Sequence, residues 1–149
     1  MEVGNGGVGV TEYQLHMSLW ALLAAPMLAG NDLTAMAPQT LAILTNKEVI
    51  AVDQDLAGIQ GDRVWAKGAV EIWIKPLRDG SKAIGFFNRF EKGSDANIAV
   101  ALTELGLPVR ARARDLWQGK ELGTLNETVA VKVSAHGVVL LRVWVAPRE

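Results

Sequence analysis

LWALLAAPMLAGND, residues 19–32, is the stretch that decides how the first part of this chain must fold. Eleven consecutive residues, Leu19 to Ala29, carry no polar side chain. A transmembrane helix needs about 20 apolar residues, and Pro26 interrupts this run. A secretory signal would place basic residues ahead of its apolar core, whereas Glu2 and Glu12 precede this one. We therefore expect no membrane partner here, but an element buried inside a protein.

The residues around this run predict a piece of α/β architecture. On a helix, Tyr13, Met17 and Trp20 would share one apolar face, and a second face would hold Leu15, Leu19 and Leu22. A helix that is apolar on two faces is buried on two sides. Pro26 should end this helix, a very short apolar strand should follow, and Pro38 should open a second helix at one of its first positions. One short strand makes no sheet, so this architecture is incomplete.

The hydrophobic period changes to two after Asp55. Apolar residues alternate in short runs, the clearest being 70–74, 98–102 and 129–133, and a nearly continuous apolar run covers 137–145. Turn signals such as Asp79-Gly80 and Gln118-Gly119 separate these runs. Six or seven short strands at this spacing predict an antiparallel β-sandwich. We expect residues 56–149 to form that sandwich and to fold independently, and residues 1–55 to lack a core of their own.

Composition excludes several kinds of function. The chain has 149 residues, a net charge of −1, no cysteine and two histidines. A charge near zero provides no overall field for nucleic acid or anionic lipid. Without cysteine there is no disulfide, thiolate metal site or cysteine nucleophile. His16 and His136 lie far apart in the sequence and form no metal-ligand cluster, so neither a metal nor another cofactor is expected.

Few charged motifs indicate chemistry. Asp53 and Asp55 are the closest carboxylate pair, and a glycosidase needs two acids roughly 5–10 Å apart. Two acids so close in sequence at a helix end more often serve as caps or loop anchors. The glycine-rich segment 4–9 lacks both the P-loop lysine and a complete GxGxxG, which favours a tight turn. The alternating Arg110, Arg112 and Arg114 are either a basic stripe for nucleic acid or, as is commoner, a solvated strand face.

Aromatic residues leave two interpretations open. Trp65, Trp73 and Trp117 are able to stack on sugar rings, but at strand positions core or inter-domain packing is at least as common. Asn126-Glu127-Thr128 matches a glycosylation sequon, a pattern that is frequent by chance.

Three segments together resemble a known family. They are EVGNGG (2–7), TEYQLHMSLWALLAAPMLAGNDL (11–33) and LAILTNKEVIAVDQD (41–55), and they look like the closing third of the catalytic barrel of family 27 glycoside hydrolases, the α-galactosidases. RDLWQGKELG (114–123) and AHGVVLLRV (135–143) are similar to the C-terminal β-sandwich of the same enzymes. The resemblance is collinear over essentially the whole chain.

The resemblance implies a fold and the positions of the family's site residues. Residues 1–55 would form the end of a (β/α)8 barrel, with Thr11–Ala25 as its seventh helix, Met27–Ala29 as its eighth strand and a last helix from Pro38 to about Asn46; residues 56–149 would form the sandwich. The catalytic aspartates of the family lie on earlier barrel strands, and a substrate-binding aspartate lies in a Trp-Asn-Asp-Pro-Asp-Met segment just before EVGNGG. None has a counterpart in this sequence, so the resemblance assigns no catalytic residue here. It places Gly30, Asn31 and Asp32 on the active-site rim.

Two functions of different classes follow as expectations. In the first, the chain is the C-terminal portion of a retaining α-galactosidase, is inactive alone, and has an α-galactoside and the missing N-terminal barrel portion as partners. In the second, it is a carbohydrate-binding or structural β-sandwich module. Because the apolar run would lack its barrel neighbours, we also expect self-association through Leu19, Trp20 and Leu22.

Overall fold

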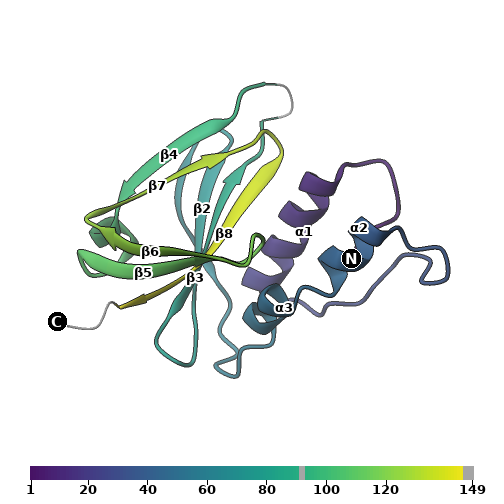
Figure 1. Cartoon of the computed structure of the whole chain (residues 1–149), viewed down its shortest axis with the longest axis horizontal. Helices are drawn as coiled ribbons and strands as arrows, with labels where there is room; N and C mark the ends of the chain where they lie inside the picture. Colours follow the sequence, from purple (N-terminus) through teal and green to yellow (C-terminus); the bar gives the residue numbers. More distant parts are fainter. Residues whose placement is uncertain (91–92, 146–149) are drawn as a thin grey trace.

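The computed structural model describes residues 1–90 and 93–145, in which three helices precede eight strands (Figure 1). The helices are α1 (Val10–Leu22), α2 (Pro38–Leu44) and α3 (Lys47–Asp53), and a short 3-10 helix, η1 (Leu102–Leu105), follows the fourth strand. The strands are β1 (Asp62–Lys67), β2 (Val70–Pro76), β3 (Lys82–Asn88), β4 (Ala96–Ala101), β5 (Arg110–Asp115), β6 (Lys120–Asn126), β7 (Thr128–Val133) and β8 (Gly137–Val145).

The strands form two antiparallel sheets, which confirms the predicted β-sandwich. A large sheet of six strands has the order β1-β2-β3-β8-β5-β6, and a small sheet pairs β4 with β7. In Figure 1 the small sheet covers one face of the large sheet and the helices cover the other. The large sheet is therefore the middle layer of three.

Strand β3 shows how one sheet serves two cores. Ile84 and Phe86 point into the cluster shared with the small sheet, whereas Ala83 and Phe87 point into the cluster shared with the helices. Side chains of a strand alternate between its faces, so a strand covered on both sides becomes apolar at nearly every position. The sequence KAIGFFN in β3 has this composition.

Helix α1 supplies most of the helical layer's contact with the large sheet. Tyr13, Met17 and Leu22 are buried in one cluster with Phe87 of β3 and Leu140 of β8. The helix begins after Gly9, whose backbone N–H donates to the Glu12 carboxylate at 2.8 Å. No helix in the described part of the chain is both long enough and apolar enough to span a bilayer.

The segment after α1 differs from the prediction. The helix ends at Leu22 rather than Ala25, because Ala24 adopts a left-handed conformation with φ of 50°. Met27–Ala29 is not a strand: within residues 1–90 and 93–145 it pairs with no other strand. A strand is defined by ladder hydrogen bonds to a neighbouring strand. Here a single hydrogen bond, from the Met1 ammonium to the Leu28 carbonyl at 3.0 Å, joins this segment to the first residue of the sequence.

Gly85 of β3 allows α1 to approach the sheet closely. A Cβ at this position would lie 2.7 Å from Leu22 Cδ1 and 2.5 Å from Phe87 Cε2, closer than carbon atoms pack. Leu22 fills the space over this glycine and is fully buried. This packing within the chain does not favour the intermolecular contact expected of Leu22, and self-association itself stays a prediction. Leu19 and Trp20 are half-buried and remain partly accessible.

Lys75 of β2 is a fully buried charge beneath the helical layer. Its Nζ donates to the Ala21 carbonyl of α1 at 3.0 Å and to the Asp53 carbonyl of α3 at 3.3 Å. The last carbonyls of a helix lack partners inside it and carry the negative end of its dipole. One ammonium group therefore satisfies the C-terminal ends of two helices and fixes both to the sheet. Burial lowers the pKa of Lys75, and the nearby Asp53 opposes that shift.

Candidate functional site at the helix–sheet junction

The predicted rim residues lie beside the first residues of the chain. A Cβ at Gly30 would lie 2.9 Å from the Met1 carbonyl oxygen, so the rim loop passes directly along that segment. Asp32 is exposed, and its Oδ1 accepts from the backbone N–H and the hydroxyl of Thr34 at 2.8 and 2.7 Å. These hydrogen bonds lower the pKa of Asp32. Asn31 is half-buried, and its Oδ1 has no partner among the described residues. Their role in substrate binding stays a prediction.

The three tryptophans proposed as sugar platforms all take part in packing. Trp117 packs against the helical cluster, and its indole N–H donates to the Ser18 hydroxyl of α1 at 2.8 Å. Trp73 packs against the same cluster and donates to Glu71 at 3.0 Å. Trp65 packs against the sandwich core. Their positions favour the packing interpretation, and stacking on sugars stays a prediction.

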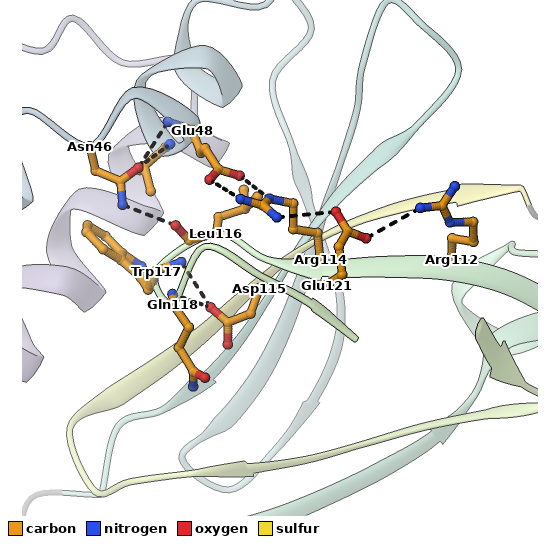
Figure 2. Close-up of polar contacts among 10 residues, drawn as sticks. Asn46, Glu48, Arg112, Arg114, Asp115, Leu116, Trp117, Gln118 and Glu121 are labelled. Carbon is orange, nitrogen blue, oxygen red and sulfur yellow. Dashed lines mark hydrogen bonds and ion pairs between the residues drawn. The ribbon is translucent and has the colours of Figure 1, made fainter. Parts of the chain in front are cut away.

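A chain of polar contacts links α3 to strands β5 and β6 (Figure 2). Asn46 caps α3, its Oδ1 accepting from the Glu48 and Val49 N–H groups, and its Nδ2 donates to the Leu116 carbonyl at 3.1 Å. Glu48 forms a bidentate pair with Arg114, with both oxygens 2.7 Å from guanidinium nitrogens. This pairing lowers the pKa of Glu48 and raises that of Arg114.

The series of polar contacts continues along the face of the large sheet that is opposite the sandwich core. Arg114 Nη1 lies 3.3 Å from Glu121 Oε1, and Glu121 Oε2 lies 3.6 Å from Arg112 Nη2. Figure 2 shows Glu48 of α3, Arg114 of β5, Glu121 of β6 and Arg112 of β5 in one line. Arg114 and Arg112 therefore lie beside carboxylates, at 2.7 and 3.6 Å, which favours the structural interpretation of this stripe over a nucleic-acid surface.

The two histidines lie in one region but form no metal site. His136 Nδ1 lies 2.7 Å from Glu12 Oε1, which joins the turn before β8 to the start of α1. The His16 ring stacks on Trp20 with centroids 4.3 Å apart, and burial lowers the pKa of His16. Both histidines line a cavity of about 300 Å³ beside Tyr13. No group of three or more metal-binding side chains occurs among the described residues.

The predicted acid pair separates into two environments. Asp55 Oδ1 accepts from the backbone N–H groups of Ala57 and Arg78 at 3.0 and 2.9 Å, which is the behaviour of a loop anchor. Asp53 is half-buried, and its Oδ1 has no hydrogen-bond partner in the described part of the chain. Burial raises the pKa of Asp53, and Lys75 opposes this shift.

Replacing Asp53 with asparagine should stabilise the protein increasingly as the pH rises above about 4, the pKa of an unfolded aspartate. The folded pKa of Asp53 is raised, so the folded state binds the proton more tightly and loses stability as that proton dissociates. Asparagine carries no charge and avoids this loss. Thermal unfolding of both proteins from pH 3.5 to 7 checks the prediction. A difference that shrinks with rising pH would contradict it. At pH 7, Asp55→Ala should destabilise the protein by about 1–2 kcal/mol, because it removes the acceptor of two backbone hydrogen bonds.

Comparisons with known proteins match both parts of the chain. The family model for the α-galactosidase C-terminal β-sandwich domain matches residues 67–143, and the model for α-galactosidase A matches residues 1–55. The α-galactosidase of Coffea arabica is 41% identical over 138 residues, which cover 91% of this chain and 36% of that protein. α-Galactosidase A of Cellvibrio japonicus is 42% identical over 152 residues, covering 95% and 37%. The chain thus spans a little over a third of the length of these relatives.

Solved structures match nearly the whole chain as well. α-Galactosidase I from Mortierella vinacea has a TM-score of 0.90 at 34% identity, with 97% of this chain and 38% of that chain covered. A family 27 β-L-arabinopyranosidase from Geobacillus stearothermophilus has a TM-score of 0.88 at 26% identity, covering 96% and 32%.

The fold and these matches agree that the chain consists of the last helices of a glycoside hydrolase barrel followed by an antiparallel β-sandwich. The chain belongs to the α-galactosidase family, family 27 of the glycoside hydrolases. Sequence reasoning missed Lys75 and Glu48, which join the helical layer to the sheet.

Proposed function

We propose that this chain is the C-terminal portion of a retaining enzyme that hydrolyses terminal α-galactosyl residues, and that it is inactive alone. The observation that carries the proposal is the collinear match of residues 1–55 and 67–143 to successive parts of α-galactosidases. A retaining mechanism needs a carboxylate nucleophile and a carboxylic acid/base. We assign neither role to this chain, since Asp55 is a loop anchor and Asp53 lies beside Lys75 at the helix–sheet junction.

The partner in this proposal is the N-terminal portion of the barrel. In a (β/α)8 barrel each helix lies between two others. Helix α1 packs on α2 and α3, while Leu15, Leu19 and Trp20 are only half-buried. These side chains would pack against the preceding barrel helix, and in its absence Leu19 and Trp20 would be the sites of self-association.

The galactosyl preference rests on the curated relatives, which are named α-galactosidases at about 40% identity. The Geobacillus structure shows that the family also includes a β-L-arabinopyranosidase. The test therefore uses the p-nitrophenyl derivatives of both α-galactose and β-L-arabinopyranose.

The experiment compares the chain alone with a fusion in which it replaces the matched segment of the Coffea arabica enzyme. We expect no nitrophenol release above buffer from the chain alone, because removing the nucleophile and acid/base forfeits nearly all catalysis. The fusion should hydrolyse the α-galactoside faster than the arabinoside, and the intact Coffea enzyme serves as the positive control. Hydrolysis by the isolated chain that Asp53→Asn or Asp55→Asn abolishes would overturn the proposal, as would a folded but inactive fusion.

A further inference from the structure

The fifth tryptophan of the chain lines a cavity on a part of the sheet surface that the helices do not cover. Trp144 of β8, together with Arg112, Glu121 and Val145, surrounds about 340 Å³. Val143, one residue earlier, is buried in the sandwich core, so Trp144 projects from the opposite face of the large sheet. The strand register places Arg112 directly across from Trp144.

Trp144 forms one wall of this cavity, and Arg142 contacts its ring. The Arg142 guanidinium lies over its ring, 5.3 Å from the centroid, which is within the range of a cation–π contact. Arg142 is itself fixed by Asp79 Oδ2 at 2.8 Å and the Ser81 hydroxyl at 3.0 Å. Trp144 is half-buried, so part of its ring is accessible. The ring therefore offers apolar area for a ligand.

The polar residues of the cavity provide a donor and an acceptor side by side. Arg112 and Glu121 lie 3.6 Å apart, and about half of each side chain is exposed, at 54% and 49%. This separation exceeds that of a well-formed charged hydrogen bond, so both groups retain capacity for a ligand. Glu121 is positioned by Arg114, which is anchored to α3 through Glu48 (Figure 2).

A pyranose sugar fits this combination better than other ligands. Its ring has a face of C–H groups that packs on an aromatic ring, and its neighbouring hydroxyls both donate and accept. An anionic ligand such as phosphate would meet the Glu121 carboxylate, and a purely apolar ligand would leave both charged groups without hydrogen bonds. In galactose the axial 4-hydroxyl places the C3, C4 and C5 hydrogens on one face, so that face is the most apolar.

We propose that the Trp144 cavity is a binding subsite for a galactopyranose residue, whose C–H face packs on the indole while adjacent hydroxyls donate to Glu121 and accept from Arg112. The identity of the sugar rests on the proposed function, because an α-galactoside is the substrate class that the family supplies. The cavity volume lies within the range of small-molecule sites, which is about 300–1,000 Å³.

The test is a titration of the full chain with methyl α-galactopyranoside, observed through the tryptophan indole N–H signals in two-dimensional NMR. We expect the Trp144 signal, assigned as the one missing from Trp144→Phe, to shift saturably. Since one sugar on one aromatic ring makes few contacts, the Kd should be on the order of a millimolar. Methyl α-glucopyranoside, with its equatorial 4-hydroxyl, should bind at least about threefold more weakly.

Variants separate the subsite from non-specific effects. Ligand-observed saturation transfer should show that Trp144→Ala weakens binding at least about tenfold, Glu121→Gln weakens it about threefold, and Trp144→Phe retains most of it. Glu104→Gln, an exposed carboxylate outside the cavity, should bind like the wild type. Unchanged binding in Trp144→Ala, a Trp144 signal that does not move, or equal shifts with both sugars would overturn the proposal. These measurements detect binding and not hydrolysis. Failure of the subsite is therefore distinguished from failure of the proposed function, which an inactive fusion would show.

Discussion

A polypeptide of residues 56–149 should fold into the β-sandwich without the helices, but it should self-associate. The core between the two sheets is formed wholly within this range, by Ile84, Phe86, Leu141 and their neighbours. Removing residues 1–55 exposes the opposite face of the sheet, including Phe87 and Leu140. Each such side chain loses roughly 1.5–3 kcal/mol of burial, and a contiguous apolar patch of this kind drives association.

Matched double variants test this prediction because neighbouring residues face opposite layers. In the polypeptide of residues 56–149, Phe87→Thr with Leu140→Thr should increase the monomer fraction while retaining the β signal in circular dichroism. The control, Phe86→Thr with Leu141→Thr, makes the same chemical changes one residue away and should unfold the sandwich. Light scattering and NMR dispersion provide the readouts. An unfolded parent polypeptide, or equal effects of the two pairs, would contradict independent folding.

In the whole chain, Lys75→Ala should lower the free energy of unfolding by about 3–5 kcal/mol. The substitution leaves a cavity where a fully buried four-carbon stem was packed. It also removes the donor to the Ala21 and Asp53 carbonyls, which are then buried with one bond fewer. Denaturant titration of wild type and variant measures the difference.

Two further variants separate the ammonium group from its stem. Lys75→Met keeps most of the apolar volume and should lose about 1–3 kcal/mol, the cost of the missing donor alone. Lys67→Ala removes an exposed lysine from the neighbouring strand and should change stability by less than about 0.5 kcal/mol. An effect of Lys75→Ala as small as that of Lys67→Ala would show that the buried ammonium does not join the helices to the sheet.

Local patterns in the sequence were sufficient for most of the fold. The change of hydrophobic period after Asp55 separates the helical part from the strands, and the turn signals fall between observed strands. Met27–Ala29 failed as a strand for a physical reason. Its apolar composition indicates burial, but a strand also needs a neighbour to exchange hydrogen bonds with, and composition cannot show whether one is present.

The junction between helices and sheet was harder to predict. Glu71, Trp73 and Lys75 alternate with apolar residues, which usually indicates a solvated strand face. In the structure the helices cover part of that face, so Lys75 is fully buried and Trp73 packs against the helical cluster. The partners of Lys75 are backbone carbonyls. Every residue has a backbone carbonyl, so the sequence does not indicate which ones Lys75 contacts. Glu48 and Arg114 are 66 residues apart, so their pairing requires the three-dimensional arrangement.

The placement of α1 against β8 has a consequence for the order of events during synthesis. Residue 22 ends α1 and residue 137 begins β8, so 114 residues lie between them. At about 5–20 residues per second, this interval is on the order of ten seconds. The Trp117–Ser18 and His136–Glu12 contacts span 99 and 124 residues, so they also become possible only late in synthesis. The helices can meet each other early, but the side of α1 that packs on β8 stays open to other proteins until β8 has left the ribosome.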